Sequence, residues 1–228
     1  MYSLPSVNTY IFDLDDTLYD ESLFVRGGTK AVLEWLALRY DLKLPSLLKM
    51  MSSITATFPR NEWYQKLIEK VDISPSQWLI DEMVEIYRNH LPHLRLFSDA
   101  ARFLTKIRGK KGVILGIITD GMVSVQKSKV RSLGLPQIMD LQIFTWSKGI
   151  EYQKPNSWAF EYVEKKIGSS GAECCYFGND LRKDFLTPNR LRWNTVYVHR
   201  RKNEHVLIPT KEHAAHIEIH SFDQISLG

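Results

Sequence analysis

The sequence predicts an α/β fold with a parallel β-sheet core, helices on both faces of that sheet, and a small all-helical domain. Two observations predict the core. Apolar runs of strand length alternate with segments of helical period along most of the chain, as in parallel sheets joined by crossover helices. Several of these runs are apolar at every position, as in strands covered on both faces. A third observation predicts the extra domain, because residues 18–95 contain helical patterns but no convincing strand.

Six apolar runs are predicted as strands of the core. The first ends in a group of acidic residues, and the second follows the turn-forming segment 109–112. The fourth contains Cys174 and Cys175, which are neighbours in the chain and too close to form a disulfide with each other. We therefore expect buried, reduced thiols there. The predicted strands are Thr9–Leu14, Val113–Ile118, Leu141–Trp146, Cys174–Phe177, Thr195–His199 and Ile217–Ile219.

Core helices are predicted between the strands, from apolar residues that recur at helical spacing. Asp99 is a candidate N-cap of the first helix. Gly134 and Gly168 mark the ends of the other two, because glycine commonly follows the last helical turn. The predicted core helices are Ala100–Ile107, Val123–Leu133 and Trp158–Ile167.

The stretch 18–95 is predicted to contain three or four helices. Apolar stripes at helical spacing support them, such as the stripe of Leu79, Met83 and Ile86. We therefore assign residues 1–17 and 96–228 to a discontinuous core domain, and residues 18–95 to an inserted helical domain. The helical segments are Thr29–Tyr40, Ser46–Thr57, Glu62–Val71 and Gln77–Asn89.

Composition and charge argue against several classes of function. With 44% apolar and 25% charged residues, a chain of 228 residues can bury a sizeable core without disulfides or a structural metal. Lysine and arginine exceed the acidic residues by only four and are scattered, so we expect no nucleic-acid partner. The sequence lacks an apolar stretch of about 20 residues and the features of a signal peptide. We therefore expect no membrane contact and a cytoplasmic location.

The histidines of the C-terminal segment do not form a metal-binding motif in the sequence. Their spacing matches none of the fixed patterns that zinc sites use. We therefore predict no metal site from His205, His213, His216 and His220.

The strongest chemical signal is the acidic end of the first strand. An apolar strand delivers Asp13 and Asp15 at its carboxyl end, which is where ligands bind in open α/β sheets. Two carboxylates one residue apart repel each other unless a cation lies between them. Capping of the next helix accounts for Asp16 and Thr17 but not for Asp13.

This segment resembles the first motif of the haloacid dehalogenase (HAD) superfamily, Asp-x-Asp-x-Thr after an apolar strand. Here it reads Asp13-Leu-Asp-Asp-Thr17, and three later segments resemble the family's other motifs in the same order. The resemblance covers nearly the whole chain. It implies a Rossmann-like core, and the stretch 18–95 has the position of the helical cap in the subgroup that carries its cap after the first motif, subfamily IA.

The second and third motifs supply groups for a phosphate. A hydroxyl and backbone N–H groups at a strand-to-helix turn can hold phosphate oxygens. By the resemblance, Thr119 and the backbone at Asp120 and Gly121 bind the phosphate. The resemblance also implies that Lys154, which precedes Pro155, neutralises both the phosphate and the attacking carboxylate.

The fourth motif departs from the family pattern. The family usually has Gly-Asp at this point and a second Asp five residues later, whereas this chain has Asn179 in the first place and Asp184 in the second. An amide oxygen binds magnesium more weakly than a carboxylate. Either Asn179 coordinates the metal directly, or the loop shifts and Asp180 does so. We favour Asn179, with Asp180 and Asp184 close behind it.

Together these motifs imply a magnesium-dependent phosphatase that acts on a small phosphorylated metabolite, a phosphate monoester. By the resemblance, Asp13 is the nucleophile that forms an aspartyl phosphate, and Asp15 is the general acid and base. Lys154 completes the catalytic set. Mg²⁺ is expected to bind Asp13, the backbone carbonyl of Asp15 and the cluster 179–184.

Alternatives remain at the level of sequence. Carbon–halogen hydrolysis needs no acid two residues after the nucleophile, so Asp15 favours phosphate chemistry. A phosphomutase would use the same residues, and a phosphate-binding regulatory module that has lost turnover would explain the Asn179 departure. The substrate and the oligomeric state, monomer or homodimer, stay open.

Overall fold

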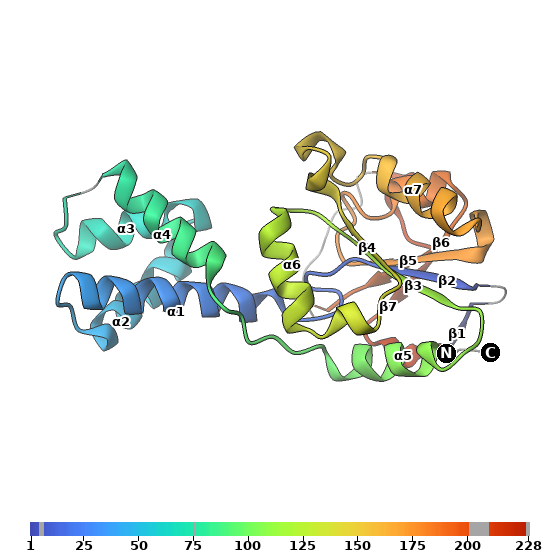
Figure 1. The fold of residues 1–228 in the computed structure, drawn as a ribbon, viewed down its shortest axis with the longest axis horizontal. Helices are drawn as coiled ribbons and strands as arrows, with labels where there is room; N and C mark the ends of the chain where they lie inside the picture. Colours follow the sequence, from blue (N-terminus) through green and yellow to red (C-terminus); the bar gives the residue numbers. More distant parts are fainter. Residues whose placement is uncertain (5–6, 75, 201–209, 227–228) are drawn as a thin grey trace. The chain divides into compact units, whose positions relative to one another are not determined.

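The computed structural model describes residues 1–4, 7–74, 76–200 and 210–226. The chain forms two compact units, which are drawn in Figure 1. The core unit consists of Met1–Glu21 and Leu94–Gly228, and the helical unit consists of Ser22–His93. Among the described residues, no helix has both the length and the apolar character needed to cross a membrane.

The core unit contains a six-stranded sheet in the order β4-β3-β2-β5-β6-β7, with all neighbouring strands parallel. The chain starts in the middle of this sheet at β2, moves out on one side through β3 and β4, and then builds the other side. The switch point therefore lies at β2, where open α/β sheets bind their ligands. The strands are β2 (Thr9–Phe12), β3 (Ile114–Thr119), β4 (Leu141–Phe144), β5 (Cys174–Gly178), β6 (Asn194–Val198) and β7 (Ile217–Ile219).

Helices cover both faces of the sheet, which confirms the predicted fold class, and Figure 1 shows α5 and α7 on opposite sides. On one face, Ile11 and Tyr176 pack in a buried cluster with Phe160 of α7. On the other face, the rings of Phe12 and Phe177 stack at 4.9 Å and meet Phe103 of α5. The core helices are α5 (Ser98–Arg108), α6 (Val123–Ser132), α7 (Trp158–Ile167) and α8 (Leu186–Arg190).

The predicted elements of the core agree with the structure to within two residues at each end. Cys174 and Cys175 are buried free thiols, as predicted. The short pair of β1 (Tyr2–Ser3) and β8 (Ile225–Ser226) was not predicted, because two residues are too few to show a period.

The prediction that Asp99 caps α5 is wrong. The helix begins at Ser98, and the N-cap is Phe97. Asp99 is buried and its Oδ2 accepts hydrogen bonds from Nη1 of Arg200 at 2.7 Å and from the backbone N–H of Phe222 at 2.8 Å. Its carboxylate therefore ties α5 to the segment after β6 instead of capping the helix.

The helical unit is built from α1 (Glu21–Arg39), α2 (Leu44–Thr57), α3 (Trp63–Lys70) and α4 (Gln77–Asn89). The first helix begins eight residues before its predicted start at Thr29, because it continues through Gly28. A Cβ at Gly28 would lie 2.6 Å from Cδ2 of Tyr87 on α4. Glycine has a low helix propensity, but here it is the residue that allows this close packing.

Candidate active site

Asp13 stands at the switch point of the sheet because it directly follows β2. Its backbone N–H donates to the carbonyl of Phe177 at 2.8 Å and so continues the pairing of β2 with β5. The side chain is 6% exposed. It points to the same face as Ile11, since alternate residues of a strand share a face.

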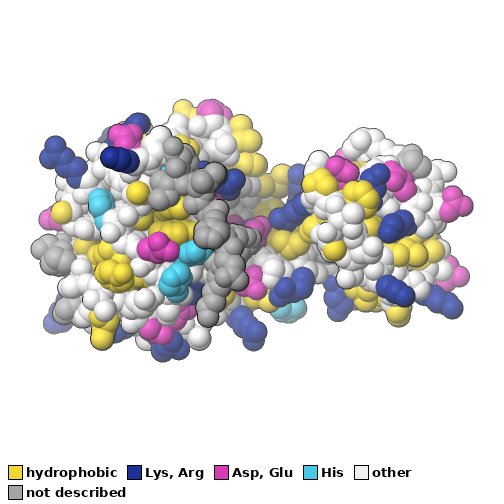
Figure 2. Space-filling model, turned by 180° about the vertical axis from the view of Figure 1, so that it is seen from behind, with side chains coloured by type: hydrophobic (Ala, Val, Ile, Leu, Met, Phe, Trp, Pro, Cys, Tyr) yellow, Lys and Arg dark blue, Asp and Glu magenta, His cyan; other side chains and the backbone are white. Residues whose placement is uncertain are grey.

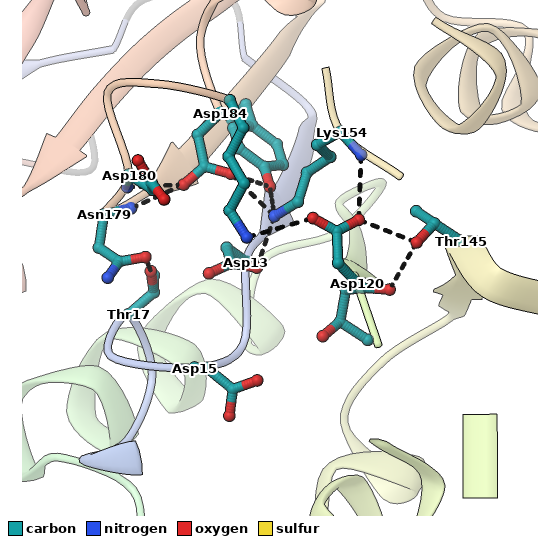
Figure 3. A network of polar contacts seen from close by, with 12 residues as sticks. Asp13, Asp15, Thr17, Asp120, Thr145, Lys154, Asn179, Asp180 and Asp184 are labelled. Atoms are coloured by element: carbon teal, nitrogen blue, oxygen red, sulfur yellow. Dashed lines mark hydrogen bonds and ion pairs between the residues drawn. The ribbon is translucent and has the colours of Figure 1, made fainter. Parts of the chain in front are cut away.

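Lys154 lies at the centre of a buried network of polar side chains, which Figure 3 shows from close by. Its ammonium donates to Oδ1 of Asp13 at 2.6 Å and to Oδ1 of Asp184 at 2.8 Å. It also donates to the hydroxyl of Tyr176 at 2.9 Å. The side chains of Lys154 and Asp184 are completely buried. Two carboxylates thus share one ammonium group in a place that water does not reach.

Asp184 is held rigidly by the turn that follows β5. Its Oδ2 accepts from the backbone N–H groups of Asn179 at 3.0 Å and Asp180 at 2.8 Å. The turn approaches the carboxylate so closely that a Cβ at Gly178 would lie 2.5 Å from Oδ2 of Asp184. The glycine before Asn179 is therefore required by the close approach of this side chain.

The side chain of Asn179 faces the nucleophile. One terminal atom of its carboxamide lies 3.1 Å from Oδ2 of Asp13 and 3.2 Å from the backbone oxygen of Asp15. With nitrogen in that place, the amide donates to both oxygens. With oxygen there, three oxygen donors come together, and oxygen is the donor type that Mg²⁺ prefers. The residues present therefore fit a magnesium ion.

Asp180 is engaged elsewhere. Its carboxylate accepts from Nε and Nη2 of Arg182 at 2.9 and 2.7 Å. Asn179 and Asp180 were both predicted as metal ligands at this turn. The geometry favours Asn179, because its side chain lies beside Asp13. Asp184 is also close, but its two oxygens are occupied by Lys154 and by the backbone of the turn.

The turn after β3 brings the second motif to the same edge. Thr119 is buried at the end of the strand, and Gly121 has a φ of 117°, which favours glycine. The Asp120 carboxylate accepts from the Thr145 hydroxyl at 2.8 Å and from the backbone N–H of Lys154 at 3.0 Å. Asp120 therefore anchors the segment that carries Lys154.

Asp15 points away from Asp13 and toward α6. Its Oδ1 accepts from Nζ of Lys129 at 2.8 Å, and its Oδ2 accepts from Nε2 of Gln126 at 2.9 Å. The hydroxyl of Tyr19 also donates to Oδ1. The two acids of the first motif thus have separate sets of partners.

Comparisons with known proteins identify the family of this chain. The sequence profile of the haloacid dehalogenase-like hydrolases matches residues 10–198. The chain belongs to this hydrolase family. The predicted resemblance is thereby confirmed, and so is the prediction that the protein is an enzyme of the hydrolase class.

Individual relatives of this HAD-like hydrolase are phosphatases by name. A glyceraldehyde 3-phosphate phosphatase of Methanopyrus kandleri is 26% identical over 86% of this chain and 85% of its own length. A ribulose-1,5-bisphosphate 5-phosphatase of Halopiger xanaduensis is 26% identical, with 82% of each chain covered. A magnesium-bound HAD hydrolase of Bacillus subtilis shares the fold, with a TM-score of 0.64, 17% identity and coverage of 95% of this chain and 96% of that one.

The electrostatics of this hydrolase differ sharply between its two motif acids. Burial raises the pKa of Asp13 to about 7, with Lys154 opposing that rise and Asp184 adding to it. Burial also works to raise the pKa of Asp15. The charge of Lys129 and the hydrogen bonds that Asp15 accepts outweigh this effect and hold its pKa below the usual value. Burial works to lower the pKa of Lys154, but its carboxylate neighbours raise it and keep the ammonium charged.

Several polar residues of this HAD-like site were missed in the sequence, among them Gln126, Lys129 and Lys183. Gln126 and Lys129 lie three residues apart on α6, and both are buried. Polar residues on the apolar face of a predicted helix are the signal that could have identified them. Lys183 lies in the fourth motif, between Asp180 and Asp184, and its ammonium lies 3.2 Å from Oδ2 of Asp120.

Proposed function

We propose that this protein is a magnesium-dependent phosphatase that hydrolyses a small phosphate monoester through an aspartyl phosphate on Asp13. One observation carries the proposal. The Asp13 carboxylate lies 2.6 Å from the ammonium of Lys154 on one side, and its other oxygen faces Asn179 and the carbonyl of Asp15. A nucleophilic carboxylate between an ammonium and a set of oxygen donors suits attack on an anionic phosphate.

The metal is proposed to be held by Asp13, the carbonyl of Asp15 and Asn179. When bound, Mg²⁺ supplies positive charge that offsets the repulsion between the nucleophile and the phosphate. The protein needs this charge, because the ion pairs of the described residues set three carboxylates, those of Asp13, Asp120 and Asp184, against two ammonium groups, those of Lys154 and Lys183.

The first step is proposed as in-line attack of an Asp13 oxygen on phosphorus. The new P–O bond forms on Asp13 while the ester P–O bond breaks, and Asp15 gives a proton to the leaving oxygen. Lys154 stabilises the charge on the phosphate, and so do the hydroxyl of Thr119 and the backbone N–H groups that follow it.

The second step returns the enzyme to its starting state. Asp15, now a carboxylate, takes a proton from water, whose oxygen attacks phosphorus and displaces the Asp13 carboxylate. In the structure Asp15 is a carboxylate paired with Lys129 at 2.8 Å. We therefore propose that it turns from this partner toward the substrate and takes up a proton before the first step.

The substrate is proposed to be a small phosphorylated sugar or a related metabolite. The named relatives act on phosphorylated carbohydrates, among them glyceraldehyde 3-phosphate and ribulose 1,5-bisphosphate. We also propose that the helical unit Ser22–His93 is the cap that the resemblance predicts, and that its residues select the organic part of the substrate.

The test is a phosphate-release assay on p-nitrophenyl phosphate and a panel of sugar phosphates, with and without Mg²⁺. We expect release that requires Mg²⁺ and that falls by at least about 10⁴-fold in Asp13→Asn. Asp16→Asn is the matched control, because Asp16 lies at a φ of 54°, which asparagine tolerates. Its side-chain oxygen accepts from the N–H of Glu21, and the asparagine oxygen can do the same.

Each other outcome points to a different function. Isomerised product without free phosphate would identify a phosphomutase. Binding of sugar phosphates without any turnover would identify a phosphate-binding module. Full activity in Asp13→Asn would refute the assignment of the nucleophile.

A further inference from the structure

Three side chains with metal-binding atoms lie together where β6 and β7 end, at the edge of the sheet. His199 directly follows β6, and its N–H donates to the carbonyl of Ile219 at 2.7 Å. This places it opposite His220, which directly follows β7, and Glu218 lies two residues before His220 on the same face. One donor atom from each of the three lies within 4.8 Å of the other two. Figure 2 shows histidine side chains beside an acidic side chain on a face of the core unit.

The hydrogen bonds of His220 prepare its ring for a metal. Its Nδ1 lies 3.1 Å from the carbonyl oxygen of His199, which can only accept. Nδ1 therefore carries the hydrogen, and the lone pair stands on Nε2. Histidines that bind metals use this arrangement, in which the other ring nitrogen donates to a carbonyl or a carboxylate.

The ring of His199 is arranged in a similar way. Its Nδ1 lies 2.9 Å from Oε1 of Glu218. Its Nε2 is buried and has no hydrogen-bond partner among the residues that the structure describes. A buried ring nitrogen without a partner costs free energy and calls for a ligand.

We propose that His199, Glu218 and His220 form a binding site for a divalent transition-metal ion such as Zn²⁺. Two imidazole nitrogens and a carboxylate oxygen are donors that Zn²⁺ readily accepts. These donors differ in kind from the oxygen donors around Asp13, which suit Mg²⁺. The protein thus has two metal sites that select different ions.

The new site is joined to the catalytic turn through the next residue. The Arg200 guanidinium donates from Nη2 to the carbonyl of Thr17 at 3.1 Å. Thr17 closes the motif that carries Asp13 and Asp15. A metal bound to His199 would fix the end of β6. It would thereby also stabilise Arg200, whose hydrogen bond to Thr17 holds the catalytic turn.

The sequence did not reveal this site, because its donors come from two strands and have no motif spacing. Of the other C-terminal histidines, His205 lies outside the described residues. His213 contacts the Thr210 hydroxyl at 2.8 Å, and His216 contacts the Thr195 hydroxyl at 2.8 Å. Of the four C-terminal histidines from which the sequence predicted no metal site, His220 is therefore the one that we now propose as a metal ligand.

The experiment is calorimetric titration of the full chain with Zn²⁺ in excess Mg²⁺, which occupies the oxygen donors at Asp13. We expect one Zn²⁺ per chain, and an affinity about 10–100-fold lower in His220→Asn and in Glu218→Gln. Glu218→Gln keeps the size of a side chain that is 56% exposed, so it preserves the fold. His213→Asn is the matched control and should bind Zn²⁺ like the unchanged protein. Bound Zn²⁺ should also raise the melting temperature, and less so in the two site variants.

Two outcomes would overturn the proposal. One is the absence of stoichiometric Zn²⁺ binding in the unchanged protein. The other is binding that survives in His220→Asn and Glu218→Gln but is lost in Asp13→Asn, which would place the ion at the catalytic oxygens. Melting curves of each variant without Zn²⁺ establish that it is folded before the titrations are compared.

Discussion

Asp13 and Asp15 are separated by a single residue, yet they lie in opposite environments. Asp13 is almost completely buried, shares Lys154 with a second carboxylate, and has a pKa raised by burial to about 7. Asp15 is less buried, is paired with Lys129, and has a lowered pKa. The difference shows that neighbours in space, and not neighbours in sequence, set the chemistry of each acid.

Lys154→Met should give the largest effect, because it removes the only ammonium that contacts both Asp13 and Asp184 among the described residues. Breaking a buried ion pair on one side leaves uncompensated charge and costs about 3–5 kcal/mol. We expect this loss in the free energy of unfolding, measured by urea titration, together with loss of turnover. Lys148→Met removes an exposed lysine from a nearby loop and is the control. A loss below about 1 kcal/mol would show that the two carboxylates do not depend on Lys154.

Lys129→Met tests the environment of Asp15. Without this charge the pKa of Asp15 should rise, because Lys129 is the chief group that lowers it. We expect a fall in kcat of about 10²-fold, together with a shift of the acidic limb of the pH–rate profile to higher pH. The stability loss should be smaller than in Lys154→Met, because the Asp15 side chain is 25% exposed and keeps Gln126.

Lys127→Met is the control for that variant, since Lys127 lies on the same helix and is exposed. An unchanged pH profile in Lys129→Met would show that Asp15 is not the general acid and base.

The pH dependence of stability should show the raised pKa of Asp13 directly. Its folded-state pKa of about 7 lies above the value of about 3.9 for an unfolded chain. Between these values the folded protein holds a proton that the unfolded chain has lost, so stability falls as the pH rises through that window. We expect the melting temperature of the metal-free protein to fall by several degrees from about pH 5 to about pH 7. Asp13→Asn cannot titrate, and an equally steep fall in that variant would assign the effect to other groups.

Asn179→Asp should give the smallest change and restores the residue that the family usually has. The new carboxylate would stand 3.1 Å from Oδ2 of Asp13, where its charge strengthens cation binding. We expect a lower Mg²⁺ concentration at half-maximal activity and a lower melting temperature without metal. Asn61→Asp, at an exposed position of the helical unit, is the control. An unchanged Mg²⁺ requirement would show that the side chain at position 179 does not bind the metal.

The order of elements could be read from the sequence because each depends on a local pattern. Uniformly apolar runs such as Cys174–Phe177 have the character of strands buried on both faces, and the structure places them in the parallel sheet. The start of α1 could not be read in this way, because Gly28 has a poor helix propensity and a glycine is favoured there by the close approach of Tyr87 on another helix. The N-cap assigned to Asp99 failed for the same reason, since its partner Arg200 is 101 residues away.

For the candidate site, the sequence by itself determined which chemical groups are available and which of them follow a strand. Asp13, Thr119 and Asn179 each come at or directly after the end of a buried strand, and parallel strands bring such ends to one edge. Only the tertiary structure decided the partners of each group: Asp184 with Lys154, Asp15 with Lys129, and His199 with His220. The physical reason is that hydrogen bonds and ion pairs act over about 3 Å, whereas these partners are separated by 20 to more than 100 positions in the printed sequence.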